Sequence, residues 1–199
     1  MVRKYCMEQT KMEIKNLIGQ YQFLEPHLVS TFLRTFTTID KFRDAEIITK
    51  NGNSEIDKDI RNVKNYALCK NKGLTEAHWH NLICVGIGKI ALQYFEERNI
   101  DYAPSKIETI TLLKYSEGGF YKPHIDSGKI HRELSAIIFL NNDYEGGHLQ
   151  FFKPNSKDLI LDIKPEPGKI VLWPSNFLFP HQATPVTKGT RYTLVSWMI

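Results

Sequence analysis

The stretch Tyr115-Ser-Glu-Gly-Gly-Phe-Tyr-Lys-Pro-His124-Ile-Asp126 sets the pattern around which this sequence of 199 residues is organised. Its Gly-Gly pair is a turn signal that follows a predicted strand over residues 106–115 and precedes a second extended segment. Because alternate side chains of an extended segment share one face, His124 and Asp126 are predicted to point the same way.

The region after Pro104 contains further strand-like segments, which are short, rich in β-branched and aromatic residues, and separated by Gly, Pro and Asn turns. Together with the first, the predicted strands cover residues 106–115, 133–140, 147–152, 159–163, 169–173 and 191–198. So many short strands favour a sandwich or barrel-like double sheet of the jelly-roll kind.

The region before Pro104 has a helical period. Apolar residues recur at spacings of three and four over residues 27–37 and from Thr75 to about residue 98, which predicts two amphipathic helices. Thr75 is the predicted N-cap of the longer helix, and Gly86 and Gly88 would allow that helix to pack closely against a sheet. Helices followed by strands indicate the α+β class, with helices packed on one sheet.

The remaining N-terminal segments have weaker patterns. Residues 1–24 are predicted to form a strand or an arm that joins the main sheet, and residues 45–49 are predicted to form a strand. The charged stretch 50–62 is interpreted either as a mobile lid or as a plain solvated connection. The length predicts a single domain over residues 1–199, with a helical support region and lid to about residue 104 and the strand-rich part from about residue 105.

Composition limits the classes of function. The net charge of +4 is mild and dispersed, which does not favour nucleic-acid binding. The cysteines Cys6, Cys69 and Cys84 are odd in number and match no zinc pattern, which predicts reduced thiols in a reducing compartment. No run approaches the roughly 18 apolar residues of a membrane helix, and the N-terminus lacks a signal-peptide core. We therefore expect a soluble cytoplasmic protein without a membrane partner; its oligomeric state is not predicted.

A metal site is one interpretation of the His-x-Asp pair. With His181 as a third ligand, His124 and Asp126 would form the facial triad of two histidines and one carboxylate that is typical of non-haem Fe(II) oxygenases. A zinc site would more often use three histidines, or cysteines as well. The alternative is a buried histidine hydrogen-bonded to a nearby carboxylate.

Arg191 lies ten residues after His181, on the last predicted strand. Alternation places Arg191, Thr193, Val195 and Trp197 on one face of that strand. An arginine on such an apolar and aromatic face needs an anion, because an unpaired buried charge is costly, and its planar fork suits a carboxylate. Either a bound anionic co-substrate or one of the chain's own acids could supply that anion.

The order and spacing of several motifs carry a resemblance to a known family. They are Tyr115-x5-Tyr121-x2-His124-x-Asp126, Arg132-x-Leu134-Ser-Ala-Ile-Ile-Phe-Leu-Asn-Asn, Tyr144-Glu-Gly-Gly-x-Leu149, Pro167-Gly-Lys-x3-Trp-Pro-Ser, His181, and Pro185-Val-Thr-Lys-Gly-Thr-Arg191-Tyr-x4-Trp197. Over roughly residues 25–199, the chain resembles the 2-oxoglutarate- and Fe(II)-dependent dioxygenases, and most closely their prolyl 4-hydroxylase branch. The resemblance implies a double-stranded β-helix with N-terminal helices packed on its major sheet.

The resemblance also implies roles for individual residues. The expected catalytic iron ligands are His124, Asp126 and His181. The residues expected to bind 2-oxoglutarate are Arg191 at the far carboxylate, Tyr115 through its phenol, and Thr193 from the same face. The residues expected to contact substrate are Tyr121, Arg132 and Trp197, although Tyr121 and Arg132 have structural roles as their alternatives.

The substrate is less well determined. The branch implies hydroxylation of an unactivated C–H of a prolyl residue in a protein or peptide, with O2 consumed and succinate and CO2 released. A requirement for ascorbate is left open. The same chemistry on a free amino acid or other small molecule, and a non-catalytic metal-binding module, remain alternatives. A nucleic-acid demethylase would predict a basic groove with exposed aromatic residues, which the dispersed charge does not indicate.

Overall fold

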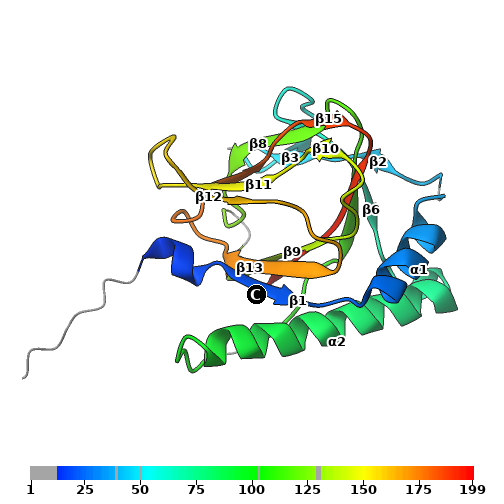
Figure 1. Cartoon of the computed structure of the whole chain (residues 1–199), viewed down its shortest axis with the longest axis horizontal. Helices are drawn as coiled ribbons and strands as arrows, with labels where there is room; N and C mark the ends of the chain where they lie inside the picture. The colour runs from blue at the N-terminus through cyan, green and yellow to red at the C-terminus, as the bar shows by residue number, and fades with distance from the viewer. Residues whose placement is uncertain (1–12, 39, 50, 103, 129–130) are drawn as a thin grey trace, which may run out of the picture.

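The computed structural model describes residues 13–38, 40–49, 51–102, 104–128 and 131–199. In Figure 1, two sheets lie above a long helix, α2 (Leu74–Glu96), with α1 (Pro26–Phe36) at one end of it. This is the α+β arrangement that the sequence predicted. Within the described residues, no helix is long and apolar enough to cross a membrane. Cys69 and Cys84 are free thiols, and Cys6 lies outside the described residues.

The major sheet has seven strands in the order β1-β13-β9-β16-β7-β6-β2. Their bounds are Gly19–Gln22 (β1), Lys169–Pro174 (β13), Leu134–Phe139 (β9), Arg191–Met198 (β16), Thr111–Tyr115 (β7), Lys64–Ala67 (β6) and Arg43–Asp44 (β2). Every neighbouring pair is antiparallel. The central strand β16 pairs with β9 on one side and with β7 on the other, and its bounds match the predicted strand.

The second sheet has five strands in the order β12-β11-β14-β8-β5. Their bounds are Leu159–Ile163 (β12), Leu149–Phe152 (β11), His181–Ala183 (β14), Phe120–His124 (β8) and Arg61–Asn62 (β5). The small pairs β3 (Ile47–Ile48) with β4 (Ser54–Glu55) and β10 (Glu145–Gly146) with β15 (Val186–Lys188) complete the strands, and η1 (Ile14–Leu17) and η2 (Lys70–Lys72) are short 3-10 turns. Two antiparallel sheets enclosing one interior form the predicted double-stranded β-helix.

The helices cover the outer face of the major sheet. Buried residues of α1 and α2, such as Phe32 and Ile83, pack in one cluster with Leu172 and Leu194 of the sheet. The inner face packs toward the second sheet in another cluster that includes Phe139 and Phe151. Because strand residues alternate between faces, each central strand contributes side chains to both clusters.

Local features of α2 contradict the predicted N-cap and confirm the predicted close packing for only one of the two glycines. The N-cap is Gly73 rather than Thr75, which lies inside the first turn, and no side chain caps the helix. A Cβ at Gly86 would come within 2.4 Å of the Phe23 ring, so this glycine does permit close packing, here against the segment after β1. A Cβ at Gly88 would have no neighbour within 4 Å, so Gly88 has no such role.

The N-terminal predictions are borne out for the described residues. Strand β1 joins the edge of the major sheet, as predicted for residues 1–24, whose first twelve residues lie outside the described part. Strand β3 lies inside the predicted strand 45–49. The stretch 50–62 carries β4 and β5, which the sequence did not predict because two-residue strands show no periodicity.

Gly168 fixes how β1 meets the rest of the sheet. It has a φ of +84°, a conformation that favours glycine, and its carbonyl accepts the backbone N–H groups of both Phe23 and Leu24. A Cβ at this position would lie 2.1 Å from the Leu24 carbonyl oxygen. Any side chain would therefore strain the backbone and push the β1 segment away from β13.

Gly168→Ala is expected to lower the free energy of unfolding by about 2 kcal/mol or more, because it adds a left-handed alanine and a backbone clash. The matched control is Gly88→Ala, which has open space and is expected to raise the free energy of unfolding by up to about 1 kcal/mol. Urea denaturation measures both. Equal stability of the two variants would contradict this account of Gly168.

Candidate metal centre

A cavity of about 1180 Å³ opens between the two sheets. Its floor includes Ile137, Trp173 and Val195 of the major sheet, and its wall includes His124 and His181 of the second sheet. The hairpin β3–β4 and the segment leading to β5 also line it, through residues that include Ile47, Ile48, Ser54, Ile56 and Ile60. The stretch interpreted as a lid or connection therefore borders the cavity, and whether it moves stays a prediction.

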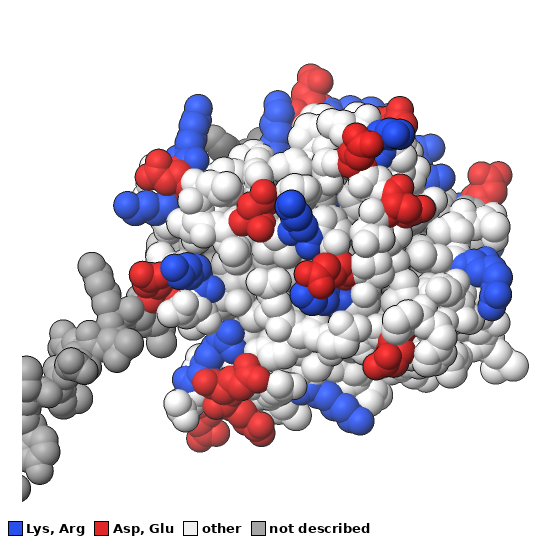
Figure 2. All heavy atoms as spheres, in the orientation of Figure 1, with Lys and Arg blue, Asp and Glu red and all other residues white. Residues whose placement is uncertain are grey.

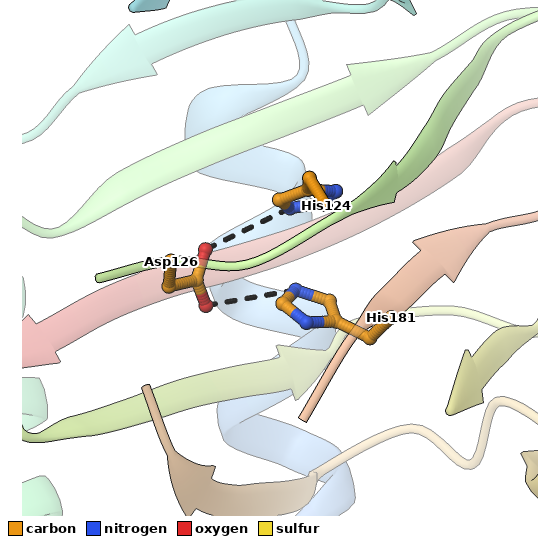
Figure 3. A group of neighbouring side chains, drawn as sticks. All are labelled: His124, Asp126 and His181. Atoms are coloured by element: carbon orange, nitrogen blue, oxygen red, sulfur yellow. Dashed lines mark ion pairs between the residues drawn. The ribbon is translucent and has the colours of Figure 1, made fainter. Parts of the chain in front are cut away.

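His124, Asp126 and His181 all line this cavity, and Figure 3 shows their side chains pointing toward one another. His124 ends β8 and His181 begins β14, and the two are direct partners in the sheet register. Asp126 Oδ1 lies 3.7 Å from His124 Nε2, and Asp126 Oδ2 lies 3.5 Å from His181 Nε2. One ligand atom from each residue lies within 4.8 Å of the other two, which is close enough for a single metal ion.

Both imidazoles are oriented by backbone carbonyls. His124 Nδ1 lies 2.8 Å from the Lys122 carbonyl, and His181 Nδ1 lies 3.0 Å from the Phe179 carbonyl. If each Nδ1–H donates to its carbonyl, each Nε2 is left as a free acceptor facing Asp126, the arrangement in which histidine binds metals. Burial and the neighbouring His181 lower the pKa of His124 to about 3, which keeps its imidazole neutral.

Asp126 is held as a carboxylate. Burial acts to raise its pKa, but His181, His124 and hydrogen bonds from Ser135 and Trp197 outweigh that effect, so the pKa lies below its usual value. Two imidazoles and one carboxylate are the donor set of the facial triad that suits Fe(II). The residues present thus fit the metal that the sequence predicted.

Arg191 is the most unusual buried group near the cavity. Its side chain is 0% exposed, and Nε, Nη1 and Nη2 have no hydrogen-bond partner among the described residues. None of the ion pairs formed by the described residues includes it. The alternative of a salt bridge to one of the chain's own acids is therefore not observed in that part of the chain, and an external anion at Arg191 stays a prediction.

The two other predicted co-substrate residues surround Arg191. The guanidinium carbon lies 4.5 Å from the centre of the Tyr115 ring, which itself lines the cavity. Thr193 is 0% exposed, and its hydroxyl also lacks a hydrogen-bond partner in the described chain. Neither Arg191 nor Thr193 is among the residues that line the cavity, and Arg191 packs on the Tyr115 ring. Their contacts with a co-substrate stay predictions.

The three predicted substrate residues also lie at the cavity. The Tyr121 ring stacks on His124 with centroids 3.5 Å apart, and Trp197 donates to Asp126. Arg132 forms an ion pair with Glu108 at 2.8 Å and covers the Trp197 ring at 3.7 Å. The structural alternative for Arg132 thus has a clear basis, while contact of any of the three with substrate stays a prediction.

Sequence reasoning missed two groups near the site. The Ser135 hydroxyl donates to Asp126 Oδ2 at 2.7 Å, and the buried Tyr144 hydroxyl has no partner among the described residues. Ser135 lies in an apolar strand where a serine is an ordinary small residue. Tyr144 belongs to the Tyr-Glu-Gly-Gly motif, but only the fold brings it beside Arg191.

Comparison with known proteins agrees with this geometry. Residues 110–199 match the family described as the 2OG-Fe(II) oxygenase superfamily. Human prolyl 3-hydroxylase 3 is 34% identical over 67 residues, which are 34% of this chain and 9% of that protein. A PKHD-type hydroxylase of Maricaulis maris is 32% identical over 100 residues, covering 48% of this chain and 43% of that protein. The chain thus spans less than half the length of these relatives.

Solved structures show the same fold. A Pseudomonas putida prolyl-4-hydroxylase superposes with a TM-score of 0.70 at 20% identity, covering 92% of both chains. A Trichoplax adhaerens prolyl hydroxylase in complex with a hypoxia-inducible-factor peptide gives a TM-score of 0.73 at 18% identity, covering 92% of this chain and 84% of that one. Residues 110–199 thus resemble the 2OG-Fe(II) oxygenase superfamily, and the fold of the chain is that of these prolyl hydroxylases.

Proposed function

We propose that this protein is an Fe(II)- and 2-oxoglutarate-dependent dioxygenase that hydroxylates a prolyl residue in a protein or peptide, with succinate and CO2 as co-products. The observation that carries the proposal is the pairing of two sites between the same sheets. A His-Asp-His cluster fits Fe(II), and the buried Arg191, which packs on the cavity-lining Tyr115, lacks an anion among the described residues. A metal ion would satisfy the ligand cluster, and a carboxylate of the co-substrate would satisfy Arg191.

Each protein group has a task in this reaction. His124, Asp126 and His181 would hold Fe(II) on one side and leave positions open on the other. When bound, iron supplies the redox chemistry by which O2 and 2-oxoglutarate hydroxylate an unactivated C–H. Arg191 would bind the distal carboxylate in two-pronged fashion. Tyr121, Trp173 and Trp197 line the cavity and would exclude water around the reacting groups.

The exposed apolar rim and the volume of the cavity support a peptide substrate over a free amino acid. Exposed isoleucines stand around it: Ile48 is 54% exposed, Ile56 is 55% exposed and Ile125 is 42% exposed, and all three line the cavity. Large exposed apolar groups at a binding cleft are typical of contact with a partner. A volume of about 1180 Å³ also exceeds what a single amino acid fills.

The alternatives are less well supported. A non-catalytic metal-binding module would not need an unpaired buried guanidinium, since a metal is bound without it. A nucleic-acid substrate would favour a concentrated basic surface. On the face shown in Figure 2, lysine and arginine side chains alternate with aspartate and glutamate. That face offers no single-sign patch for a phosphate backbone.

The direct test supplies the purified chain with Fe(II), 2-oxoglutarate and O2, with and without a proline-rich peptide or free proline, and with and without ascorbate. Succinate release stimulated by the peptide, together with one added oxygen on a prolyl residue by mass spectrometry, is expected. His124→Ala should abolish both by removing a metal ligand. Stimulation by free proline alone would favour the small-molecule alternative. Metal binding without succinate under any condition would favour a binding module.

Ser135→Ala is expected to weaken metal binding by about 10- to 100-fold, because the hydroxyl that orients Asp126 is lost. Titration with Fe(II) under nitrogen, or with Co(II), measures the affinity. Ser196→Ala is the matched control. Ser196 is also a buried serine, but it lies on the face of β16 that points away from Arg191 and Trp197. An unchanged affinity in Ser135→Ala would show that the hydroxyl does not position the ligand.

Ile56→Ser is expected to raise the KM for the peptide by about 5- to 10-fold, because an apolar contact is lost on binding. The dissociation constant for 2-oxoglutarate and the thermal stability should stay unchanged, since Ile56 is exposed. Leu159→Ser is the control, because Leu159 is 50% exposed but lies on β12 outside the cavity. Equal peptide KM values for both variants would argue against the isoleucine rim as a substrate surface.

A further inference from the structure

Tyr144 reaches the interior from outside the two main sheets. It immediately precedes β10, in the connection that follows β9, and packs with the cluster that contains Tyr115 and Val186. Its hydroxyl is buried and has no hydrogen-bond partner among the described residues. A buried hydroxyl without a partner is costly, so its retention there needs a reason.

The backbone at Gly147 brings Tyr144 and Arg191 together. Gly147 has a φ of +63°, and a Cβ there would lie 2.8 Å from Arg191 Cδ and 2.9 Å from Tyr144 Cε2. Both side chains therefore lie directly over this glycine, which leaves them the space that any other residue would fill. The pair Gly146-Gly147 thus has a packing function in addition to its turn.

The unpaired groups in this part of the interior are mainly donors. They are Tyr144 Oη, Arg191 Nε, Nη1 and Nη2, and Thr193 Oγ1. The guanidinium cannot accept a hydrogen bond, so the two hydroxyls cannot donate to it. Burial raises the pKa of Tyr144 to about 12, against the opposing effects of the Arg191 charge and of a guanidinium N–H that faces the phenol oxygen, so the phenol keeps its proton at neutral pH. A cation flanked by neutral O–H groups is complementary to a carboxylate.

We propose that Tyr144 is a positioning residue for the co-substrate, and that its hydroxyl donates to the same distal carboxylate that Arg191 binds. This inference rests on the proposed function and deepens it. Tyr144 and Thr193 would each donate one hydrogen bond beside the two-pronged contact from Arg191. The Tyr115 ring, which lines the cavity, lies 4.5 Å from the guanidinium carbon and so separates these donors from the cavity.

The position of these donors selects for a second carboxylate. They lie behind the cavity wall, whereas the His-Asp-His cluster lies in the cavity itself. A 2-oxoacid that carries only one carboxylate could occupy the metal positions but would leave Tyr144, Arg191 and Thr193 unpaired. Tyr144 is therefore expected to contribute to the preference for a dicarboxylate.

The test measures 2-oxoglutarate binding directly, by calorimetry on the metal-loaded protein without O2, for wild type, Tyr144→Phe, Arg191→Met and the double variant. Tyr144→Phe keeps the ring and removes only the hydroxyl, and it is expected to bind about tenfold more weakly, as for loss of a hydrogen bond to a charged group. In the Arg191→Met background, the same change should cost much less, because the carboxylate is no longer held at that place.

Tyr192→Phe is the matched control, because Tyr192 adjoins Arg191 in sequence but faces the helices. Its affinity for 2-oxoglutarate should equal that of wild type, and thermal denaturation should show that all variants are folded. Equal binding by Tyr144→Phe and wild type would overturn the role of Tyr144 while leaving the proposed function intact. Failure of wild type to bind 2-oxoglutarate would overturn both proposals.

Discussion

A guanidinium enclosed between two sheets, without a carboxylate of the described chain beside it, is the constraint on which this structure depends. Burying an unpaired charge costs several kcal/mol, which a single domain of ordinary stability tolerates only if something compensates. Arg191 is 0% exposed, and the hydroxyls of Tyr144 and Thr193 beside it are also unpaired. The interior is thus incomplete by itself, and a bound dianion would both complete it and stabilise the fold through its binding energy.

The pleat of β16 explains how one strand serves two purposes. Tyr192, Leu194 and Met198 face the helices and join the outer core, whereas Arg191, Thr193 and Trp197 face the interior. The register with β7 places Arg191 opposite Tyr115, and the register between β14 and β8 places His181 opposite His124. Residues distant in sequence therefore meet because two antiparallel pairings are fixed by apolar faces, and a slip by one residue in either would separate the site.

Much of this arrangement could be predicted from the sequence, for identifiable reasons. The strands β16 and β12 were found at their observed bounds, and the His-x-Asp spacing already implied a shared face. The two-residue strands β4 and β5 were missed because no period exists over two residues. The cap at Gly73 was misplaced because Thr75 offered a better local signal. Ser135 and Tyr144 could not be found, since their importance depends on partners brought close only by the tertiary fold.

The central place of β16 in the major sheet has a consequence for synthesis on the ribosome. Before Arg191–Met198 emerges, the sheet exists at most as two separate parts, β1-β13-β9 and β7-β6-β2, each with an open edge where β16 belongs. Open edges readily pair with other chains. A nascent chain would therefore remain vulnerable to aggregation until almost all of the residues described here have left the exit tunnel, and cotranslational holding by a chaperone would be most useful in that interval.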